Sequence, residues 1–416
     1  MIVTHIKELL SSEPGKDTSV VFVGTLINVF AGGLFFILVP RLLGPSNFGI
    51  FSTVVATGLL ATAVANFGID TGILKFAKDS TYANAVFSIA LKSYILLGLA
   101  TAILGFVLAR PIAIFLGQPQ IALFLRIAFA FTIFLLLTNF YVSALQSQKQ
   151  FIKASIVNIS SNIGRIVLLA IAAYFFTVGL YFVTMLFFSV TVISVVIGAS
   201  MLTFKYQSKS DIKINEFHKY NLWIAASLIL ASIPFDNYFL LKISGPIQTG
   251  LYAAPFKILT FAYQFGGNFT RVLATRFTSF DSHEKVKDFS LKSMTFVWVF
   301  ILALLFLITQ SGPIVTVLFG QGYLDAVPVM RILALGFVFF FAATIPSSII
   351  LYYFGKSNIS FVITFLRYLV FVLLLLVLIP AQNAIGAAYA FTLSEGFALA
   401  LMTLYVLLKF QKKHVG

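Results

Sequence analysis

The chain has 416 residues, of which 60% are hydrophobic and only 10% are charged. A water-soluble fold of this size would expose far more apolar surface than soluble proteins do, so the composition excludes that class. The absence of cysteine excludes disulfides and thiolate metal sites. We expect no metal cofactor, since the four histidines show no ligand spacing. They are His5, His218, His283 and His414.

An N-terminal interfacial segment is expected at residues 1–17, where apolar residues line one face of a short amphipathic helix. Twelve stretches of about 20 mostly apolar residues follow, and each can cross about 30 Å of hydrocarbon. The first six predicted spans are 18–40, 48–69, 86–108, 121–143, 155–176 and 179–203. The second six are 220–241, 251–275, 292–309, 329–354, 359–380 and 384–407.

The two sets of six spans carry an internal repeat. The turn after the first span contains a cation, a Gly-Pro pair, a glycine and an aromatic residue, in that order. The turn after the seventh span contains the same series, offset by 201 residues. A second matched pair begins at Pro111 and at Pro313, with an offset of 202 to 205. Because six is even, the copies enter the membrane from the same side as parallel repeats around a central cavity, which favours alternating access.

We therefore predict an all-α polytopic membrane protein with four parts. These are the interfacial segment at 1–17, an N-lobe at 18–204, a cytoplasmic linker at 205–219 and a C-lobe with a basic tail at 220–416. Lys and Arg gather in one set of loops, which hold 19 of the 28 cations if both termini are cytoplasmic. This basic inner face favours anionic lipid headgroups, and it explains the net charge of +15 without nucleic acid.

Several segments in both halves resemble the multidrug/oligosaccharidyl-lipid/polysaccharide (MOP) exporter superfamily, specifically Wzx-type O-antigen flippases. They are residues 41–52, 66–70, 235–238, 250–254 and 318–336. The resemblance implies a MATE-like fold and no enzymatic activity. It also implies movement of an undecaprenyl-pyrophosphate-linked oligosaccharide from the cytoplasmic to the periplasmic leaflet of the bacterial inner membrane. Other polysaccharide assembly proteins would be partners.

The chain departs from the related lipid II flippases in two respects. Those proteins carry cavity arginines in helices 1, 2 and 8 and usually have two further C-terminal helices. Here spans 1 and 2 have no mid-span cation, span 8 carries Lys257 and Arg271, and the sequence ends near the twelfth span. These departures favour the Wzx-type branch over transport of a peptidoglycan precursor.

Ionisable residues at membrane depth identify candidate substrate-binding sites, because each costs at least about 2.5 kcal/mol there without a partner or a wet cavity. Arg165 lies near the middle of span 5, and we expect it to be an unpaired cation that binds the pyrophosphate. The alternative is a hydrogen bond to backbone carbonyls or polar groups of another helix. Arg271 lies nearer the inner end of span 8, where it binds substrate or snorkels to headgroups.

Two further cations lie at the depth of acidic residues. Asp236 lies at about the depth of Lys257 in the membrane, and Glu395 at about the depth of Arg367. Each cation therefore either lines the cavity or forms a structural ion pair. Asp236 and Glu395 are also candidates for coupling to a proton or sodium gradient. Asp70, toward the inner end of span 2, couples an ion or pairs with a nearby lysine.

Two other functions compete with the flippase. A MATE-like exporter of organic cations would need an acidic cavity, whereas the mid-span charges here are four cations and two acids. A glycan polymerase or ligase would need catalytic groups in a large outer loop. The longest outer segment, 310–328, holds only Asp325 as an ionisable residue, which disfavours an enzyme.

Overall fold

The structure is a computed structural model that describes residues 13–77, 80–206, 229, 232–277, 280 and 282–411, with the side chains of 13–22, 80–81, 262–272 and 274–276 not described. Within these ranges all regular secondary structure is helical and there is no β-strand, which confirms the predicted all-α class. The predicted interfacial helix at residues 1–12 and most of the predicted linker lie outside the described residues.

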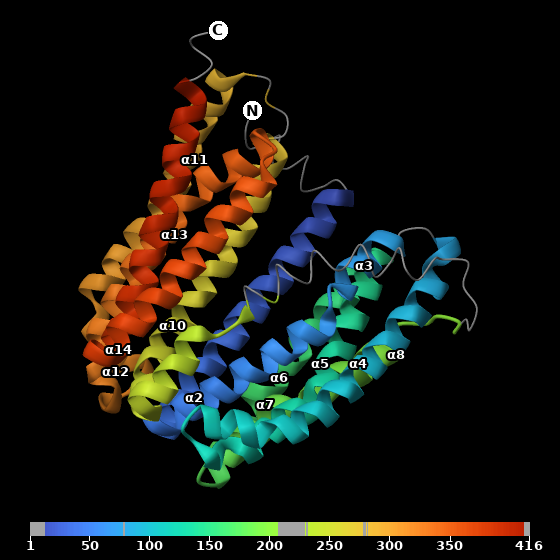
Figure 1. The fold of residues 1–416 in the computed structure, drawn as a ribbon. Helices are drawn as coiled ribbons and strands as arrows, with labels where there is room; N and C mark the ends of the chain where they lie inside the picture. The colour runs from blue at the N-terminus through green and yellow to red at the C-terminus, as the bar shows by residue number, and fades with distance from the viewer. Residues whose placement is uncertain are drawn as a thin grey trace. The chain divides into compact units, whose positions relative to one another are not determined.

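The described residues of the first half of the chain form seven α-helices and one short 3₁₀ turn, and these helices are labelled in Figure 1. They are α2 Glu13–Asn66, α3 Ile69–Phe76, α4 Ser80–Phe115, η1 Pro119–Ile121, α5 Ala122–Ser147, α6 Phe151–Phe175, α7 Leu180–Ser189 and α8 Thr191–Met201. Predicted spans 3, 4 and 5 correspond to α4, α5 and α6. The sixth is divided between α7 and α8 at Val190.

The second half repeats this pattern of long helices. Its elements are α10 Phe235–Phe277, α11 His283–Thr309, α12 Ser311–Phe319, η2 Gln321–Ala326, α13 Val327–Ser348, η3 Ile349–Tyr353 and α14 Ser357–Gln411. The element η3 is a single π-helical turn at the end of predicted span 10. Half of predicted span 7, residues 220–228, 230 and 231, lies outside the described residues.

Backbone breaks divide the longest helices where the sequence predicts turns. Gly44 breaks α2 with φ 70° and ψ 171°, and Gly245 breaks α10 with φ 80° and ψ 178°. Only glycine adopts this conformation readily, because a Cβ would clash with the backbone. The two glycines stand 201 residues apart and share one conformation, so the repeat seen in the sequence is also a repeat of backbone geometry.

Eight helical stretches within the described residues are long and apolar enough to cross a membrane. Two of them, Val23–Asn66 and Ser357–Gln411, have 44 and 55 residues, so each can cross about 30 Å twice at about 1.5 Å per residue. In α14 the break falls at Asn383, between predicted spans 11 and 12. The protein is therefore a multi-pass membrane protein, and the count of twelve spans stays a prediction.

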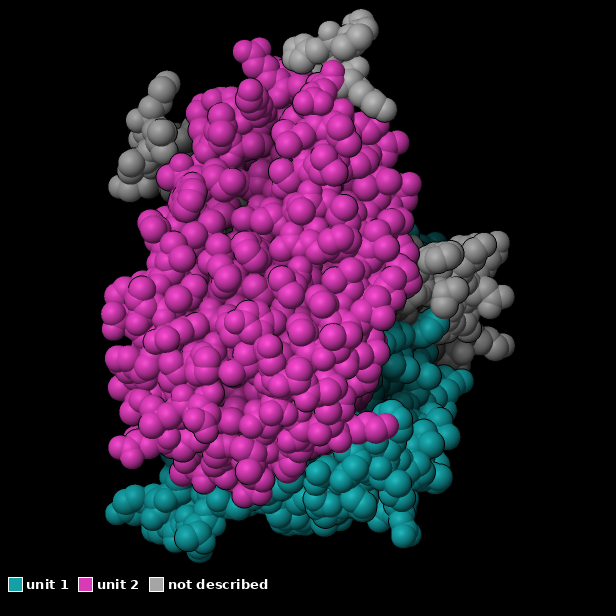
Figure 2. Space-filling model, turned by 60° about the vertical axis from the view of Figure 1, so that its left-hand side comes forward, with its two compact units in different colours: residues 1–35, 50–234 teal, residues 36–49, 235–416 magenta. Residues whose placement is uncertain are grey.

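The chain divides into two compact units, coloured separately in Figure 2. Unit 1 comprises residues 1–35 and 50–234, and unit 2 comprises 36–49 and 235–416. Residues 36–49 belong to the predicted N-lobe but pack within unit 2. Their contacts explain this: Arg41 Nη1 donates to the Val317 carbonyl at 3.2 Å, and the Lys257 ammonium lies 5.3 Å from the centre of the Phe36 ring. The outer boundaries of the predicted lobes remain predictions.

Each unit has its own apolar core. In unit 1, helices α3 to α6 bury residues such as Ile69, Phe87 and Phe140. In unit 2, helices α10, α13 and α14 pack the rings of Phe256, Phe337 and Phe391 together, with ring centres 5.3 to 6.2 Å apart. The many large apolar side chains that remain exposed, as along α4, are the surface expected of helices in lipid.

Candidate functional site

Arg165 lies in the interior of unit 1 on α6, with only 7% of the residue exposed. Its Nε donates to the backbone carbonyl of Phe187 on α7 at 2.9 Å, and its Nη1 donates to Asn162 Oδ1 at 2.7 Å. The guanidinium carbon lies 4.0 Å from the centre of the Phe187 ring, within cation–π range. Arg165 is therefore not the unpartnered cation that we expected, because a carbonyl and an amide hold it.

A second amide extends this network to the first predicted span. Asn162 Nδ2 donates to Asn28 Oδ1 at 2.7 Å, so the chain of contacts runs from α2 through α6 to α7. All partners of Arg165 in it are neutral. A guanidinium has five N–H donors, and two are used in these bonds. No acid in this network offsets the charge of Arg165, and donors of the guanidinium remain for another acceptor.

Phenylalanine rings enclose the Phe187 side of the network. Phe187 lies 5.9 Å from Phe35 and 5.7 Å from Phe51 between ring centres, the latter edge to face. Such packing keeps water from the hydrogen bonds and fixes the Phe187 carbonyl that Arg165 uses. The position of Arg165 is therefore set by the core of unit 1.

Arg367 and Glu395 form the predicted ion pair in unit 2. Both lie on α14, on either side of the break at Asn383, and Arg367 Nη1 contacts Glu395 Oε1 at 2.5 Å. The side chains are 18% and 8% exposed, and the guanidinium also lies 4.2 Å from the centre of the Tyr368 ring. Because an acid and a base lie in direct contact, this pair carries no net charge.

Asp236 and Lys257, both on α10, interact electrostatically in unit 2, as their matched depths predict. Their interaction is not a direct ion pair. The Asp236 carboxylate accepts from the backbone N–H of Asn237 at 2.8 Å, whereas the Lys257 ammonium faces the Phe36 ring. Tyr252, fully buried on α10, also interacts with Asp236. The charge of Lys257 is therefore offset by an acid more than that of Arg165, whose partners are neutral, and less than that of Arg367, which contacts its acid directly.

The two remaining candidates are less informative. Asp70 lies on α3 and accepts from the backbone N–H of Thr71 at 2.8 Å and from its hydroxyl at 3.4 Å. Asn66, four residues before Asp70, accepts a hydrogen bond at its Oδ1 from the buried Tyr94 hydroxyl at 2.6 Å. Arg271 lies on α10, but its side chain is outside the described residues.

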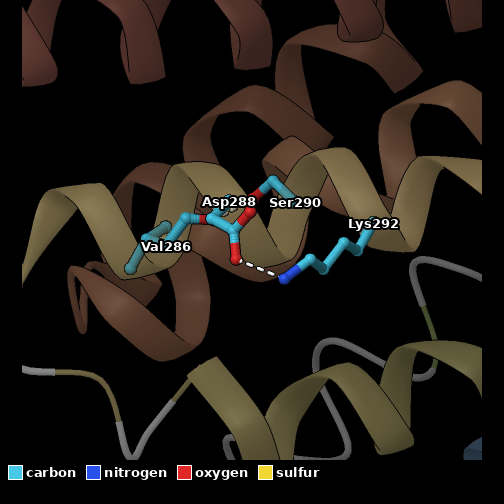
Figure 3. Close-up of polar contacts among 4 residues, drawn as sticks. All are labelled: Val286, Asp288, Ser290 and Lys292. Carbon is cyan, nitrogen blue, oxygen red and sulfur yellow. Dashed lines mark hydrogen bonds and ion pairs between the residues drawn. The ribbon is translucent and has the colours of Figure 1, made fainter.

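An exposed ion pair provides a contrast with these buried charges. On α11, Lys292 Nζ contacts Asp288 Oδ2 at 2.7 Å while the Ser290 hydroxyl donates to the Val286 carbonyl (Figure 3). The side chains of Lys292 and Asp288 are 72% and 62% exposed, so water screens the pair and it adds little stability. The described residues contain no group of three or more His, Cys, Asp or Glu side chains able to hold a metal ion.

Sequence reasoning missed Asn28 and Asn162, although a signal existed. Asn162 precedes Arg165 by three residues, which is the spacing at which side chains meet on one face of a helix. Asn28 stands in an otherwise apolar span, where a side-chain amide needs a partner. Together they show that the polar interior of unit 1 is built by asparagines as well as by its arginine.

The long apolar helices, the matched glycine breaks and the buried charges define a polytopic membrane protein built from two repeats. The profile of the family described as "Polysaccharide biosynthesis protein" matches residues 15–267, which is 253 of 416 residues (267 − 15 + 1). The chain belongs to this family. Among curated proteins no significant match was found.

Solved structures of MOP superfamily transporters share the fold. "Lipid II flippase MurJ, inward closed conformation" matches with a TM-score of 0.74 and 14% identity, over 94% of this chain and 87% of that one. An inward-facing MATE family multidrug resistance transporter of the MOP superfamily also gives 0.74, at 16% identity, over 94% and 95%. A MOP transporter from Pyrococcus furiosus, titled for the reverse polarity of its binding pocket, gives 0.60 at 16% identity, over 97% of each chain. The predicted MOP fold is confirmed.

Proposed function

We propose that the protein is a flippase for an undecaprenyl-pyrophosphate-linked oligosaccharide, the repeat unit of O-antigen or a related surface polysaccharide. It moves this lipid from the cytoplasmic to the periplasmic leaflet of the bacterial inner membrane by alternating access, with both termini cytoplasmic. Membership of a polysaccharide biosynthesis family and the MOP fold support this proposal. A MurJ-like fold is compatible with a lipid-linked cargo.

One observation carries the choice of an anionic cargo. Arg165 is buried in unit 1, and its hydrogen-bond partners are the neutral groups of Phe187 and Asn162. An unneutralised charge at membrane depth is costly, so its retention favours a function. A pyrophosphate offers acceptor oxygens that match the fork of donors in a guanidinium. The remaining donors of Arg165 would contact these oxygens.

The other charges would play supporting parts. Lys257 and Arg271 would add positive potential along the path of the head group, whereas Arg367 is neutralised by Glu395 and would serve as a structural ion pair. Asp236, Glu395 and Asp70 are candidates for coupling transport to a proton or sodium gradient. Aromatic side chains would stack on sugar rings. Other polysaccharide assembly proteins would receive the product.

Export of organic cations is the alternative, because MATE transporters share the fold equally well. A cation would be repelled by Arg165, and the two buried acids of unit 2 each interact with a cation already. The charge distribution of the described residues therefore favours an anion. A glycan polymerase or ligase is the third reading, and the MOP fold offers it less support.

A complementation experiment tests the proposal. Deleting the gene should remove the surface glycan and cause lipid-linked repeat units to accumulate in the inner leaflet, and the wild-type gene should restore both. An Arg165→Ala gene, expressed and inserted at the wild-type level, should fail to restore them. Normal surface glycan in the deletion strain would contradict the proposal.

A further inference from the structure

Arg126 of unit 1 is a second arginine whose charge meets no acid. It lies on α5, and its guanidinium carbon is 4.5 Å from the centre of the Phe106 ring on α4. Its Nε is buried and has no hydrogen-bond partner among the described residues. The residue as a whole is partly exposed, and the described residues supply no acceptor for its two terminal nitrogens. The guanidinium is therefore held by an aromatic ring, with its terminal donors open to a ligand.

The helices around Arg126 contain no acidic residue. Residues 80–210, which include α4 to α8, hold eight Lys and Arg residues and no Asp or Glu. A ring that packs on a guanidinium attracts the charge but does not neutralise it. An anion able to balance Arg126 therefore comes from outside these helices.

An exposed apolar stripe on α4 leads to the same place. Four exposed residues follow the three- and four-residue spacing of one helix face: Leu96, Leu99, Ile103 and Phe106. The next position in this spacing is Arg110, which is also exposed. From Leu96 to Phe106 the helix rises about 15 Å at about 1.5 Å per residue, which is half of a hydrocarbon core of about 30 Å. The stripe thus has the length of one leaflet and ends at two arginines.

The second repeat lacks this arrangement. Arg331 corresponds to Arg126 at the repeat offset of 205 residues. Ser311, at the same offset, takes the place of Phe106. Arg331 Nε donates to the Ser311 hydroxyl at 2.7 Å, so a neutral group of the protein satisfies it. Four residues after Ser311 the second repeat has a valine where the first has its second arginine. Of the two repeats, the first is therefore the one that leaves a paired set of cations without a partner.

We propose that Arg126 and Arg110 form a binding site for the phosphate of a lipid, whose hydrocarbon chain lies along the exposed stripe of α4. Guanidinium groups offer forked donors that match phosphate oxygens. The Phe106 ring holds one of the two in place, so less side-chain freedom is lost on binding. The predicted orientation places both arginines at the outer end of unit 1, so the lipid belongs to the outer leaflet. The site lies within one unit and needs no transport activity, so it stands apart from the proposed function.

Native mass spectrometry of the full-length protein in detergent tests the site. Phosphatidylglycerol and undecaprenyl phosphate are titrated separately, with diacylglycerol as the probe that has chains but no phosphate. Arg126→Gln and Arg110→Gln should each weaken binding of the first lipid phosphate about tenfold, or about 1.4 kcal/mol, because each removes a charged donor. Binding of diacylglycerol should not change. The matched control is Arg331→Gln, which makes the same change of charge in unit 2 and should bind both phosphates as the wild type does.

Wild-type affinity for both phosphates in Arg126→Gln and Arg110→Gln would overturn the site. An equal loss in Arg331→Gln would also overturn it, since the effect would then come from net charge alone. Arg110 is exposed, so Arg110→Gln still decides the proposal if Arg126→Gln does not fold. The two phosphate probes identify the source of the lipid. Tighter binding of undecaprenyl phosphate would assign the site to a polyprenyl carrier, and equal or tighter binding of phosphatidylglycerol would assign it to a membrane phospholipid.

Discussion

The two units hold their buried arginines in opposite ways. In unit 1, Arg165 is bound by the carbonyl of Phe187 and the amide of Asn162, so its charge is kept. In unit 2, Arg367 is bound by Glu395, so its charge is cancelled. Both arrangements satisfy the guanidinium, but only the first leaves a net charge for a ligand to neutralise. Burial of a charge is therefore weak evidence of a binding role until its partners are known.

The largest effect should follow removal of the uncompensated charge. Arg165→Ala should reduce transport about 10- to 150-fold, the range that corresponds to loss of a charged hydrogen bond worth about 1.5–3 kcal/mol. Export of glycan in the complemented deletion strain measures this. Arg165→Lys should rescue only partly, because an ammonium lacks the planar fork that matches phosphate. Full activity of Arg165→Ala at normal insertion would remove Arg165 from the site.

Breaking the cancelled pair should cost stability. Glu395→Leu leaves Arg367 buried without its acid, and we expect a loss of about 3–5 kcal/mol in the free energy of unfolding. Arg367→Leu should cost less, because a carboxyl group can be neutralised by a proton and a guanidinium cannot. Thermal unfolding of the purified protein in detergent tests this order.

The double variant Arg367→Leu with Glu395→Leu is the control. It should unfold close to the wild-type temperature, since two apolar side chains need no partner. Glu395→Leu unfolding at the wild-type temperature would show that the ion pair is not buried as described.

Substitution of Lys257 should change stability and transport less than substitution of either arginine. Lys257→Met keeps much of the side-chain volume but loses the contact with Phe36, which is worth about 1 kcal/mol. Transport should fall less than in Arg165→Ala, since Asp236 already offsets part of the charge of Lys257. Lys292→Met is the matched control, because its ion pair with Asp288 is exposed, and its effect should stay within about 0.5 kcal/mol. A stability loss from Lys257→Met as large as that from Glu395→Leu would place Lys257 in a tight pair.

Several features could be predicted from the sequence because each depends on one helix or one hairpin. Helix positions follow from apolar length, and the breaks at Gly44 and Gly245 follow from the Gly-Pro pattern. The Arg367–Glu395 pair follows from depth arithmetic, since the two spans are consecutive and antiparallel. Each of these inferences needs only local geometry.

Other features depend on packing between distant segments, so the sequence does not show which groups are partners. The Phe187 carbonyl that holds Arg165 is a backbone group, and any residue could supply it. The pairing of Asn28 with Asn162 joins positions 134 residues apart. Residues 36–49 pack in unit 2 because of contacts with Val317 and Lys257 that the sequence does not reveal. The partners of a buried charge therefore had to come from the structure.

The most direct test gives Arg165 an acidic partner, as Arg367 has in Glu395. Asn162→Asp places a carboxylate of nearly the same shape 2.7 Å from Arg165 Nη1, where the amide oxygen now lies, and so cancels the charge. Its second oxygen replaces the Nδ2 that donates to Asn28, so the Asn28 amide must turn and donate its own N–H to that oxygen. If the uncompensated charge serves the substrate, glycan export in the complemented strain should fall as far as in Arg165→Ala, while insertion and thermal stability remain at wild-type levels. Export at the wild-type rate from a stable Asn162→Asp protein would contradict the account.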